Sequence, residues 1–259
     1  MIGLDFPIKP EWISDVLQLW KPRQPIKELI QDTLSQTMQE LGGEKTRRNS
    51  LSIILRNFVT IEGKGNSRHT VDQDLWVEYS RQYSISEMAP VYLTQIISNN
   101  DVARDASEFI DNRYTIGDKI VSAELKRQII SKYGERKVVT NSVSAFLRTL
   151  QYFHVLSDGE KLGEYLYTSK PETSREVFPL LVWSWWKSNR QPQIDLEMFE
   201  HQSERQFLDT ENFNDYWRSY QTELWTISER LDGKQANLIF VDSESFQEAM
   251  ITTIINPIE

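Results

Sequence analysis

Basic side chains cluster in the middle of this 259-residue chain, in a pattern that suits the binding of phosphate groups. Between positions 119 and 148, seven cationic residues stand against only two acidic ones, Glu124 and Glu135. The cationic residues are Lys119, Lys126, Arg127, Lys132, Arg136, Lys137 and Arg148. Phosphate neutralisation on a nucleic acid needs a local excess of this kind, and helix N-termini add backbone N–H donors. The segment therefore predicts contact with double-stranded DNA.

The spacing of apolar residues predicts that two helices and a β-hairpin hold these side chains. One helix is expected from about Ser122 to Tyr133 and a second from about Thr140 to Phe153, after a turn. In the second helix, the i, i+3, i+4, i+7 spacing of one buried face is shown by Val143, Phe146, Leu147 and Leu150. Two short strands around Asp158-Gly159 follow it. Two helices followed by such a hairpin, or wing, are typical of a winged helix-turn-helix.

The outward face of the second helix carries candidate DNA-binding residues. Asn141 and Ser144 are expected to offer hydrogen bonds to base edges or phosphates in the major groove, with Thr140 beside them. The residues expected to contact phosphates are Lys137, Arg148, the neighbouring Arg136 and, in the wing, Lys161. The same segment also fits two helices and a hairpin that pack together and bind no nucleic acid.

A second basic site is formed by Arg47 and Arg48, near the start of a helix predicted from about Glu44 to Val59. Cations at the start of a helix oppose the macrodipole, so another interaction must favour them there. A phosphate backbone would serve, and so would the solvent or the acidic C-terminal third. These alternatives stay open.

The net charge of −9 is unevenly distributed along the chain. Residues 1–70 carry ten basic and eight acidic side chains, residues 71–170 carry twelve and fourteen, and residues 171–259 carry seven and sixteen. Charges further apart than a Debye length, about 8 Å at physiological salt, are largely screened from each other. A basic face can therefore act beside an acidic C-terminal third.

The composition also bounds the cellular setting. The chain contains no cysteine, which excludes disulfides and thiolate metal ligands and fits a reducing cytoplasm. No run of about 18 apolar residues occurs, so that no membrane partner is expected. The protein is predicted to be cytoplasmic.

A catalytic site is not expected. Asp118 with Glu135 and Lys137 matches the residue types of metal-dependent nucleases, in which carboxylates hold magnesium and a lysine assists the attacking water. That chemistry needs the E-x-K motif on a strand beside the aspartate, whereas here the motif falls in a turn between helices. We therefore predict no catalytic residue, no metal and no cofactor, and a small metal-dependent nuclease is the weakest hypothesis.

The chain as a whole is predicted to be mainly α-helical and to have three parts. Residues 1–112 form a helical N-terminal region, residues 113–170 the winged helix-turn-helix, and residues 171–259 a helical region rich in acidic and aromatic side chains. In the last part, helices are expected near 174–189, 195–207 and 209–231, followed by a strand over 236–241. No internal repeat is expected.

Three segments of the chain resemble the BrxA family, small accessory proteins encoded in BREX phage-defence systems of bacteria and archaea. They are TRRNSLSIILRNF, the pattern DVARDASEF…YTIGDKIVSAELKRQI, and TNSVSAFLRTLQYFHVL, and the resemblance covers roughly residues 24 to 168. It implies a mainly helical protein with a winged helix that can bind DNA, acting beside larger methyltransferase and ATPase partners. The acidic end from Pro171 onward has no counterpart in this resemblance.

Two hypotheses about the function are favoured, one for a DNA-binding protein and one for a protein adaptor. The first is a non-enzymatic winged-helix protein that binds DNA or an assembly built on it. The second is an adaptor whose winged helix and aromatic, acidic end both dock partner proteins, because winged helices often mediate protein contacts instead. Salt-dependent binding of duplex DNA distinguishes the two.

Overall fold

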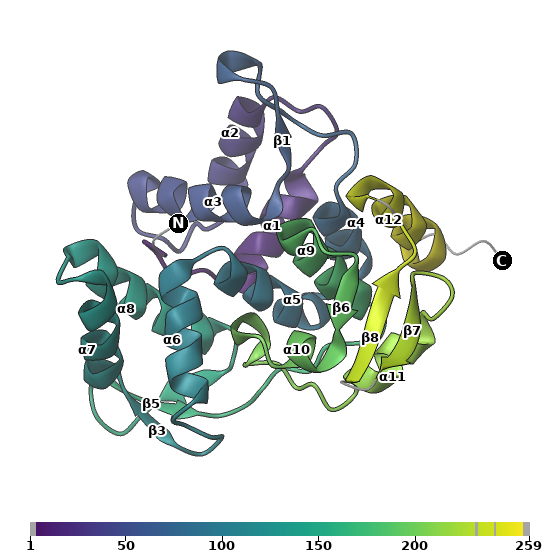
Figure 1. Ribbon diagram of the computed structural model, residues 1–259. Helices are drawn as coiled ribbons and strands as arrows, with labels where there is room; N and C mark the ends of the chain where they lie inside the picture. Colours follow the sequence, from purple (N-terminus) through teal and green to yellow (C-terminus); the bar gives the residue numbers. More distant parts are fainter. Residues whose placement is uncertain (1–3, 231–232, 241, 256–259) are drawn as a thin grey trace.

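The computed structural model describes residues 4–230, 233–240 and 242–255, and it is mainly helical, as predicted (Figure 1). The helices are α1 (Pro10–Leu19), α2 (Ile26–Gln36), α3 (Glu44–Phe58), α4 (Leu75–Gln82), α5 (Ile85–Ser98), α6 (Asp101–Asp111), α7 (Ser122–Tyr133), α8 (Lys137–Tyr152), α9 (Phe178–Asn189), α10 (Leu196–Glu200), α11 (Phe213–Ser219) and α12 (Ser243–Met250). The strands are β1 (Ile61–Glu62), β2 (His69–Thr70), β3 (Lys119–Val121), β4 (Leu156–Asp158), β5 (Glu164–Tyr167), β6 (Gln193–Asp195), β7 (Trp225–Arg230) and β8 (Gly233–Leu238). Among the described residues, no helix combines the length and the apolar character needed to cross a bilayer.

The middle segment folds as two packed helices, α7 and α8, followed by the hairpin β4–β5. Strand β3 directly precedes α7 and pairs antiparallel with β5, so that the sheet order is β3-β5-β4. The helix predicted over 122–133 is confirmed as α7. The next helix, α8, begins at Lys137 rather than near Thr140, because Arg136 adopts the extended N-cap conformation and the first turn brings Val139 into the core.

The N-terminal segment is built from α1, α2 and α3, which pack on one another, and from the hairpin β1–β2. The helix predicted over 44–59 is confirmed as α3. Pro25, the residue before α2, forms an antiparallel bridge to His69 of β2. This bridge ties the start of α2 to the far strand of the hairpin.

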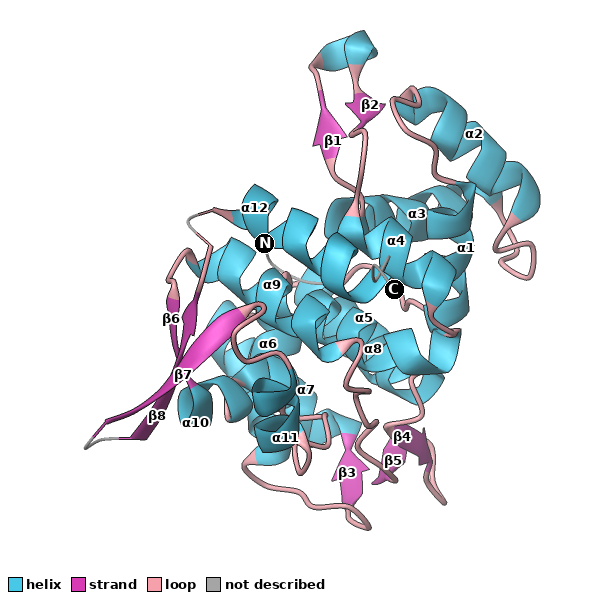
Figure 2. Ribbon diagram, turned by 90° about the vertical axis from the view of Figure 1, so that its right-hand side faces the viewer, coloured by secondary structure: helices cyan, strands magenta, loops and turns pink. Residues whose placement is uncertain are grey.

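Helix α5 lies at the centre of the molecule, where it packs against α1, α3, α4, α6 and α9 (Figure 2). The buried apolar side chains form one continuous cluster that extends from Leu4 to Ile254. All three predicted parts of the chain contribute to this cluster. The middle segment is therefore held on a scaffold made of the rest of the protein.

The C-terminal region contains more strand than predicted. Strands β6, β8 and β7 form an antiparallel sheet in that order. The helix predicted over 209–231 is wrong beyond Ser219, where α11 ends, because Thr222 adopts a left-handed φ of 77° that a helix cannot hold. Position 231 lies outside the described residues. The aromatic and β-branched start of β7 at Trp225 favours the strand that replaces the predicted helix.

The helix predicted over 195–207 is also wrong. Only α10 is α-helical there, and a 3₁₀ turn over Ser203–Arg205 follows it. Asp195 ends β6 and caps α10 by accepting a hydrogen bond from the N–H of Met198 (2.8 Å). The predicted start is therefore nearly right, and the error lies in the length, because α10 ends at Glu200.

Two other predicted elements of this region are present, but they begin at different residues than predicted. The helix predicted over 174–189 is α9, which begins only at Phe178, with Pro179 in its first turn where proline is well tolerated. The strand predicted over 236–241 is β8, which begins earlier because it pairs with both β6 and β7. Position 241 lies outside the described residues.

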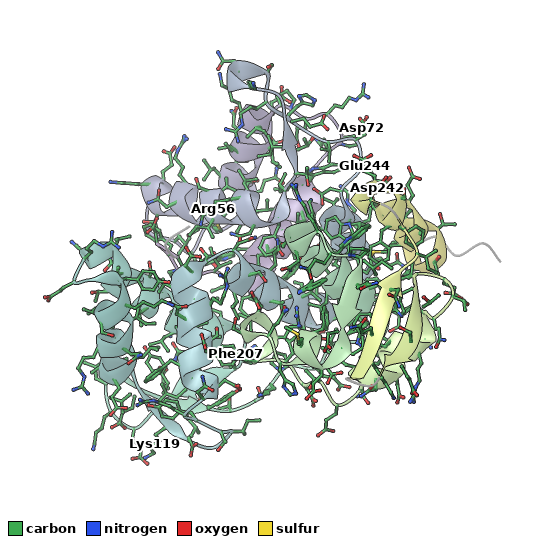
Figure 3. All side chains as sticks on the ribbon, in the orientation of Figure 1. Arg56, Asp72, Lys119, Phe207, Asp242 and Glu244 are labelled. Atoms are coloured by element: carbon green, nitrogen blue, oxygen red, sulfur yellow. The ribbon has the colours of Figure 1, made fainter. Side chains whose placement is uncertain are left out.

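Phe207 couples the C-terminal region to the middle segment, and its replacement by alanine should destabilise the protein (Figure 3). Its ring is 1% exposed and lies 6.3 Å from the ring of Phe146 in α8 and 5.9 Å from that of Tyr167 in β5. Phe207→Ala should lower the free energy of unfolding by about 3–5 kcal/mol, since it leaves a cavity between these elements. Denaturant unfolding followed by circular dichroism measures this change.

The matched control is Leu162→Ala at the tip of the wing, where the side chain is fully exposed. Its free energy of unfolding should stay within about 0.5 kcal/mol of the parent. Equal stability of Phe207→Ala and the parent would contradict the proposed coupling.

Candidate nucleic-acid interface

One polar stripe runs along the exposed side of α8. Lys137, Asn141, Ser144 and Arg148 are all exposed and follow one another at i, i+4, i+7 and i+11, the spacing of a single helix face. The opposite face is fully buried and consists of Val139, Val143, Phe146 and Leu150. Burial of the apolar face therefore turns the stripe, named here the α8 stripe, toward the solvent.

The first turn of α8 is open to an anion. Arg136 occupies the N-cap position, and no side chain caps the turn. The Arg136 guanidinium donates instead to the carbonyl of Tyr133 (3.0 Å) and remains exposed. Free backbone N–H groups at a helix start, next to the Lys137 ammonium, form a site suited to a phosphate oxygen.

Arg148 connects the α8 stripe to the wing. Its guanidinium donates to Gln151 Oε1 (2.9 Å), and Gln151 Nε2 donates in turn to Asp158 Oδ1 (2.7 Å) at the end of β4. The guanidinium also lies over the Tyr152 ring, 4.9 Å from its centroid. A hydrogen bond with the Tyr152 side chain raises the pKa of Arg148, so this cation is charged and held in place.

Asn141, Ser144 and Thr140 offer hydrogen-bonding groups without further charge. Ser144 Oγ donates to the backbone carbonyl of Thr140 (3.1 Å), which leaves its lone pairs free to accept. Asn141 is exposed, whereas Thr140 is half-buried at the edge of the stripe. Of the predicted base-contacting residues, Asn141 and Ser144 are the more accessible.

Carboxylates lie beside both lysines of the β4–β5 hairpin and its neighbouring strand. The Lys161 side chain is 80% exposed, and its Nζ lies 4.0 Å from Glu164 Oε1. Lys119 on the neighbouring strand (labelled in Figure 3) pairs with Glu160 at the tip of the hairpin (2.9 Å). Two carboxylates in the hairpin therefore offset these two lysines, a pairing that the linear sequence did not indicate.

The structure separates Arg47 from Arg48. Arg48 pairs with Glu44 one turn earlier on α3 (2.7 Å). Arg47 donates instead to Gln39 Oε1 (3.0 Å), and its Nε is buried without a partner among the described residues. Both arginines of the predicted phosphate site therefore have protein partners, and contact with phosphates stays a prediction for each of them.

A groove of about 450 Å³ lies between α3 and the first turns of α8, a feature that the sequence analysis missed. Asn49, Ser52 and Arg56 line it from α3, and Lys137 and Asn141 line it from α8. The acidic residue in its lining is Asp5 of the N-terminal segment. The groove thus joins part of the α8 stripe to residues far away in the sequence.

Arg56 is the dominant charge on the α3 side of the groove (Figure 3). Burial lowers the pKa of Arg56 from its usual value, and the Asp5 carboxylate acts in the opposite direction. The Arg56 side chain forms no hydrogen bond or ion pair within the described parts of the chain. A partly desolvated guanidinium of this kind is suited to an anionic ligand.

The acidic C-terminal region packs on the far side of α8. Figure 1 shows the sheet β6-β8-β7 and α12 on the right and the pair α7 and α8 on the left. Phe207 contacts Phe146 on the buried face of α8. Nothing in the described residues beyond 170 forms a hydrogen bond or ion pair with the α8 stripe.

The nuclease-like residues are not assembled into one site. Asp118 directly precedes β3, and its Oδ2 accepts hydrogen bonds from the N–H (2.7 Å) and the hydroxyl (3.0 Å) of Thr115. Glu135 and Lys137 follow the other end of α7, which at 12 residues is about 18 Å long. Among the described residues, no group of three potential metal ligands is present.

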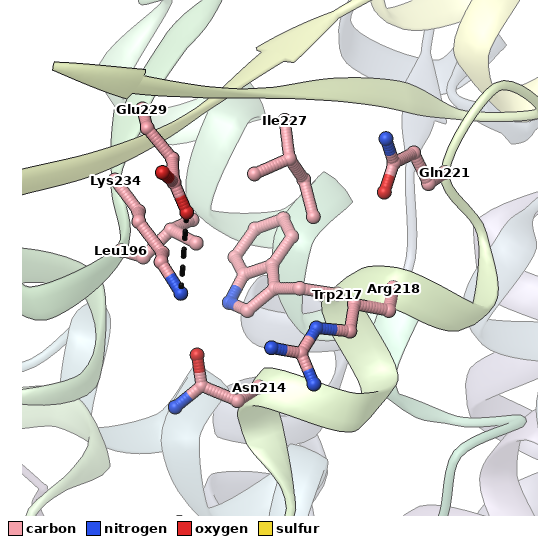
Figure 4. A pocket seen from close by; sticks show the side chains of 8 residues that line it. All are labelled: Leu196, Asn214, Trp217, Arg218, Gln221, Ile227, Glu229 and Lys234. Carbon is pink, nitrogen blue, oxygen red and sulfur yellow. Dashed lines mark ion pairs between the residues drawn. The ribbon is translucent and has the colours of Figure 1, made fainter.

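A second cavity, of about 220 Å³, lies in the C-terminal region between α11 and the sheet (Figure 4). The indole N–H of Trp217 is buried beside it and donates no hydrogen bond within the described chain. Lys234 Nζ lies 3.8 Å from Glu229 Oε1, and Asn214 and Arg218 complete the polar lining. An unpaired buried donor suits a ligand group that accepts hydrogen bonds.

Comparison with known proteins adds no relative to these observations, since no family model, no curated protein and no solved structure matches the chain.

Magnesium should not stabilise this protein specifically. Because α7 holds Asp118 and Glu135 apart, they cannot share one ion, and millimolar Mg²⁺ should leave the melting temperature unchanged. The melting temperature is a sensitive readout, because a ligand at about 100 times its dissociation constant raises the free energy of unfolding by about 2.7 kcal/mol. A Mg²⁺-dependent rise in the melting temperature of the parent that is absent from Glu135→Ala would contradict the separation.

Proposed function

We propose that this chain binds double-stranded DNA through a winged helix-turn-helix, with α8 in the major groove. The observation that carries the proposal is the α8 stripe, which is exposed and basic at both ends and lies on the side opposite the acidic C-terminal region. A buried or acid-paired stripe would leave α8 a structural helix only.

The arrangement of elements around α8 supports a winged helix. The order β3, α7, α8, β4 and β5, with the sheet order β3-β5-β4, gives two packed helices followed by a hairpin whose far strand also pairs with the segment before α7. Helix α6 packs against both α7 and α8 and completes a three-helix core. In DNA-binding proteins of this type, the last helix of the core enters the major groove.

The side chains of the interface divide into two roles. Lys137, with the open first turn of α8, and Arg148 are placed to contact phosphates on either side of the groove. Asn141 and Ser144 lie between them and are placed to face base edges, where an asparagine amide can pair with the donor and acceptor of adenine. Lys161 contributes a weaker contact from the wing, because Glu164 offsets it.

The resemblance to the BrxA family supplies the proposed setting. An accessory component of a phage-defence system would bind DNA beside a larger methyltransferase and ATPase. DNA bound at the α8 stripe would not cover the rest of the surface, so the C-terminal region could contact such partners at the same time.

A protein-docking role is the second candidate, and the cavity at Trp217 favours it. A partner group with hydrogen-bond acceptors would satisfy the unpaired indole N–H next to Arg218. Stable co-purification with a partner that Arg218→Glu abolishes, combined with no salt-dependent retention of duplex DNA, would favour docking over DNA binding.

Reversing the two end charges of the α8 stripe should weaken duplex binding. Lys137→Glu combined with Arg148→Glu should lower the affinity by about tenfold or more, because two phosphate contacts become repulsive. The dependence of log affinity on log salt should become shallower by about two, since each contact contributes about 0.9. Fluorescence anisotropy titrations at several salt concentrations measure both quantities.

The matched control reverses two exposed arginines of the C-terminal region, Arg175→Glu with Arg218→Glu, and changes the net charge equally. The control should bind duplex within about twofold of the parent. Parental affinity in the α8 variant, or equal losses in the variant and the control, would contradict the proposed interface.

A further inference from the structure

A twelve-residue pattern occurs twice in the chain. The segment 45–56, KTRRNSLSIILR, and the segment 137–148, KVVTNSVSAFLR, have identical residues at six aligned positions: Lys, Asn, Ser, Ser, Leu and Arg. The prediction that the chain has no internal repeat did not take this pair of segments into account. A match of twelve residues is weak evidence by itself. The structure strengthens it, because the two segments form corresponding helices, α3 and α8.

The elements around α3 repeat the elements around α8. Helix, helix and hairpin follow in the order α2, α3, β1 and β2, as they do in α7, α8, β4 and β5. Pro25 precedes α2 and bridges to His69 of β2, and Val121 precedes α7 and pairs with Glu164 of β5. In both cases the residue before the first helix pairs with the far strand of the hairpin, and α1 packs on α2 and α3 as α6 packs on α7 and α8.

The first helices of the two units also correspond in detail. Glu28-Leu29 of α2 matches Glu124-Leu125 of α7, and both leucines are fully buried. Six residues after each leucine stands a serine, Ser35 or Ser131. Each serine hydroxyl donates to the carbonyl three residues earlier, at 2.8 Å in α2 and 2.6 Å in α7.

The second helices present the same polar stripe. Lys45, Asn49, Ser52 and Arg56 follow the i, i+4, i+7, i+11 spacing on α3, and they are named here the α3 stripe. Ser52 Oγ donates to the carbonyl of Arg48 (2.8 Å), as Ser144 Oγ does to that of Thr140. The buried face of α3 includes Leu51 and Ile54, which match Val143 and Phe146 in α8.

The two stripes meet in the groove between α3 and α8. Asn49, Ser52 and Arg56 face Lys137 and Asn141 across its volume of about 450 Å³. Its charged lining consists of two cations and one carboxylate, Asp5. The groove therefore favours an anion that is long enough to contact both helices.

We propose that α3 belongs to a second winged unit and that one sugar-phosphate backbone of the bound duplex lies in the groove between α3 and α8. This inference rests on the proposed function. The major groove is about 12 Å wide and admits one helix, and a helix with its side chains is about 10–12 Å across. With α8 in the major groove, α3 must therefore stand on the other side of the adjoining backbone, where the α3 stripe faces the phosphates.

The decisive variant is Lys45→Glu with Arg56→Glu, measured beside the α8 variant and the C-terminal control in the full chain. Duplex affinity should fall by about tenfold or more and the salt slope should become shallower by about two. If the charge-reversed protein does not fold, Lys45→Gln with Arg56→Gln removes the same two charges more mildly, and its affinity should fall in the same direction.

The outcomes separate this inference from the proposed function. Parental affinity in the α3 variant together with weakened binding in the α8 variant would overturn the second unit and leave the proposed function intact. Parental affinity in both variants would overturn both. Binding of a single-stranded oligonucleotide at least as tightly as duplex would overturn the duplex backbone as the occupant.

Directed cleavage locates the backbone itself. The chain has no cysteine, so Asn49→Cys and Asn141→Cys each provide one attachment site for an iron–EDTA reagent. The two conjugates should cut the same strand within about one helical turn, 10 base pairs, of each other. Cleavage from position 141 with none above background from position 49 would overturn the shared backbone.

Discussion

The burial of one face of α8 is the constraint on which the interface depends. Val139, Val143, Phe146 and Leu150 are fully buried, and Phe207 from the C-terminal region packs against Phe146. Because side chains on a helix keep a fixed angular relation, burial of this face fixes the opposite stripe toward the solvent. The α8 stripe therefore keeps its direction through apolar packing and needs no partner of its own.

The acidic C-terminal region has a supporting place in this arrangement. It holds most of the excess negative charge of the chain, and it also supplies the Phe207 ring that packs against the middle segment. Glu204 meets Arg104 of α6 at 3.3 Å, on the same inner side. A net charge of −9 is thus compatible with a basic α8 stripe, because the excess negative charge belongs to residues 171–259, and none of those that the structure describes pairs with the stripe.

The local pattern of the sequence predicted α3, α7 and most of α8, because each has an apolar face at helical spacing. It also predicted the accessibility of Asn141 and Arg148. It could not predict β3, whose three residues become a strand only by pairing with β5, or β6 and β7, which pair with the predicted strand β8. Such elements depend on partners distant in sequence.

The groove between α3 and α8 could not be predicted from the local sequence either. Arg56 and Lys137 line one cavity only because the core places α3 beside α8. The shared K-x-x-x-N-S-x-S-x-x-L-R pattern is visible in the sequence, yet its meaning depends on the matching order of helices and strands around it. The hydrogen bond from Arg47 to Gln39 was equally invisible in the sequence, because Gln39 lies outside α3.

The central claim is that this protein neutralises phosphates of duplex DNA with an exposed basic face. The affinity of the unaltered protein for a random duplex, measured at about 50 mM and about 200 mM salt, tests it most directly. Four to six contacts predict a fall of about 10²–10³ in affinity over that range. An affinity that does not change with salt, or no binding at the lower concentration, would contradict it.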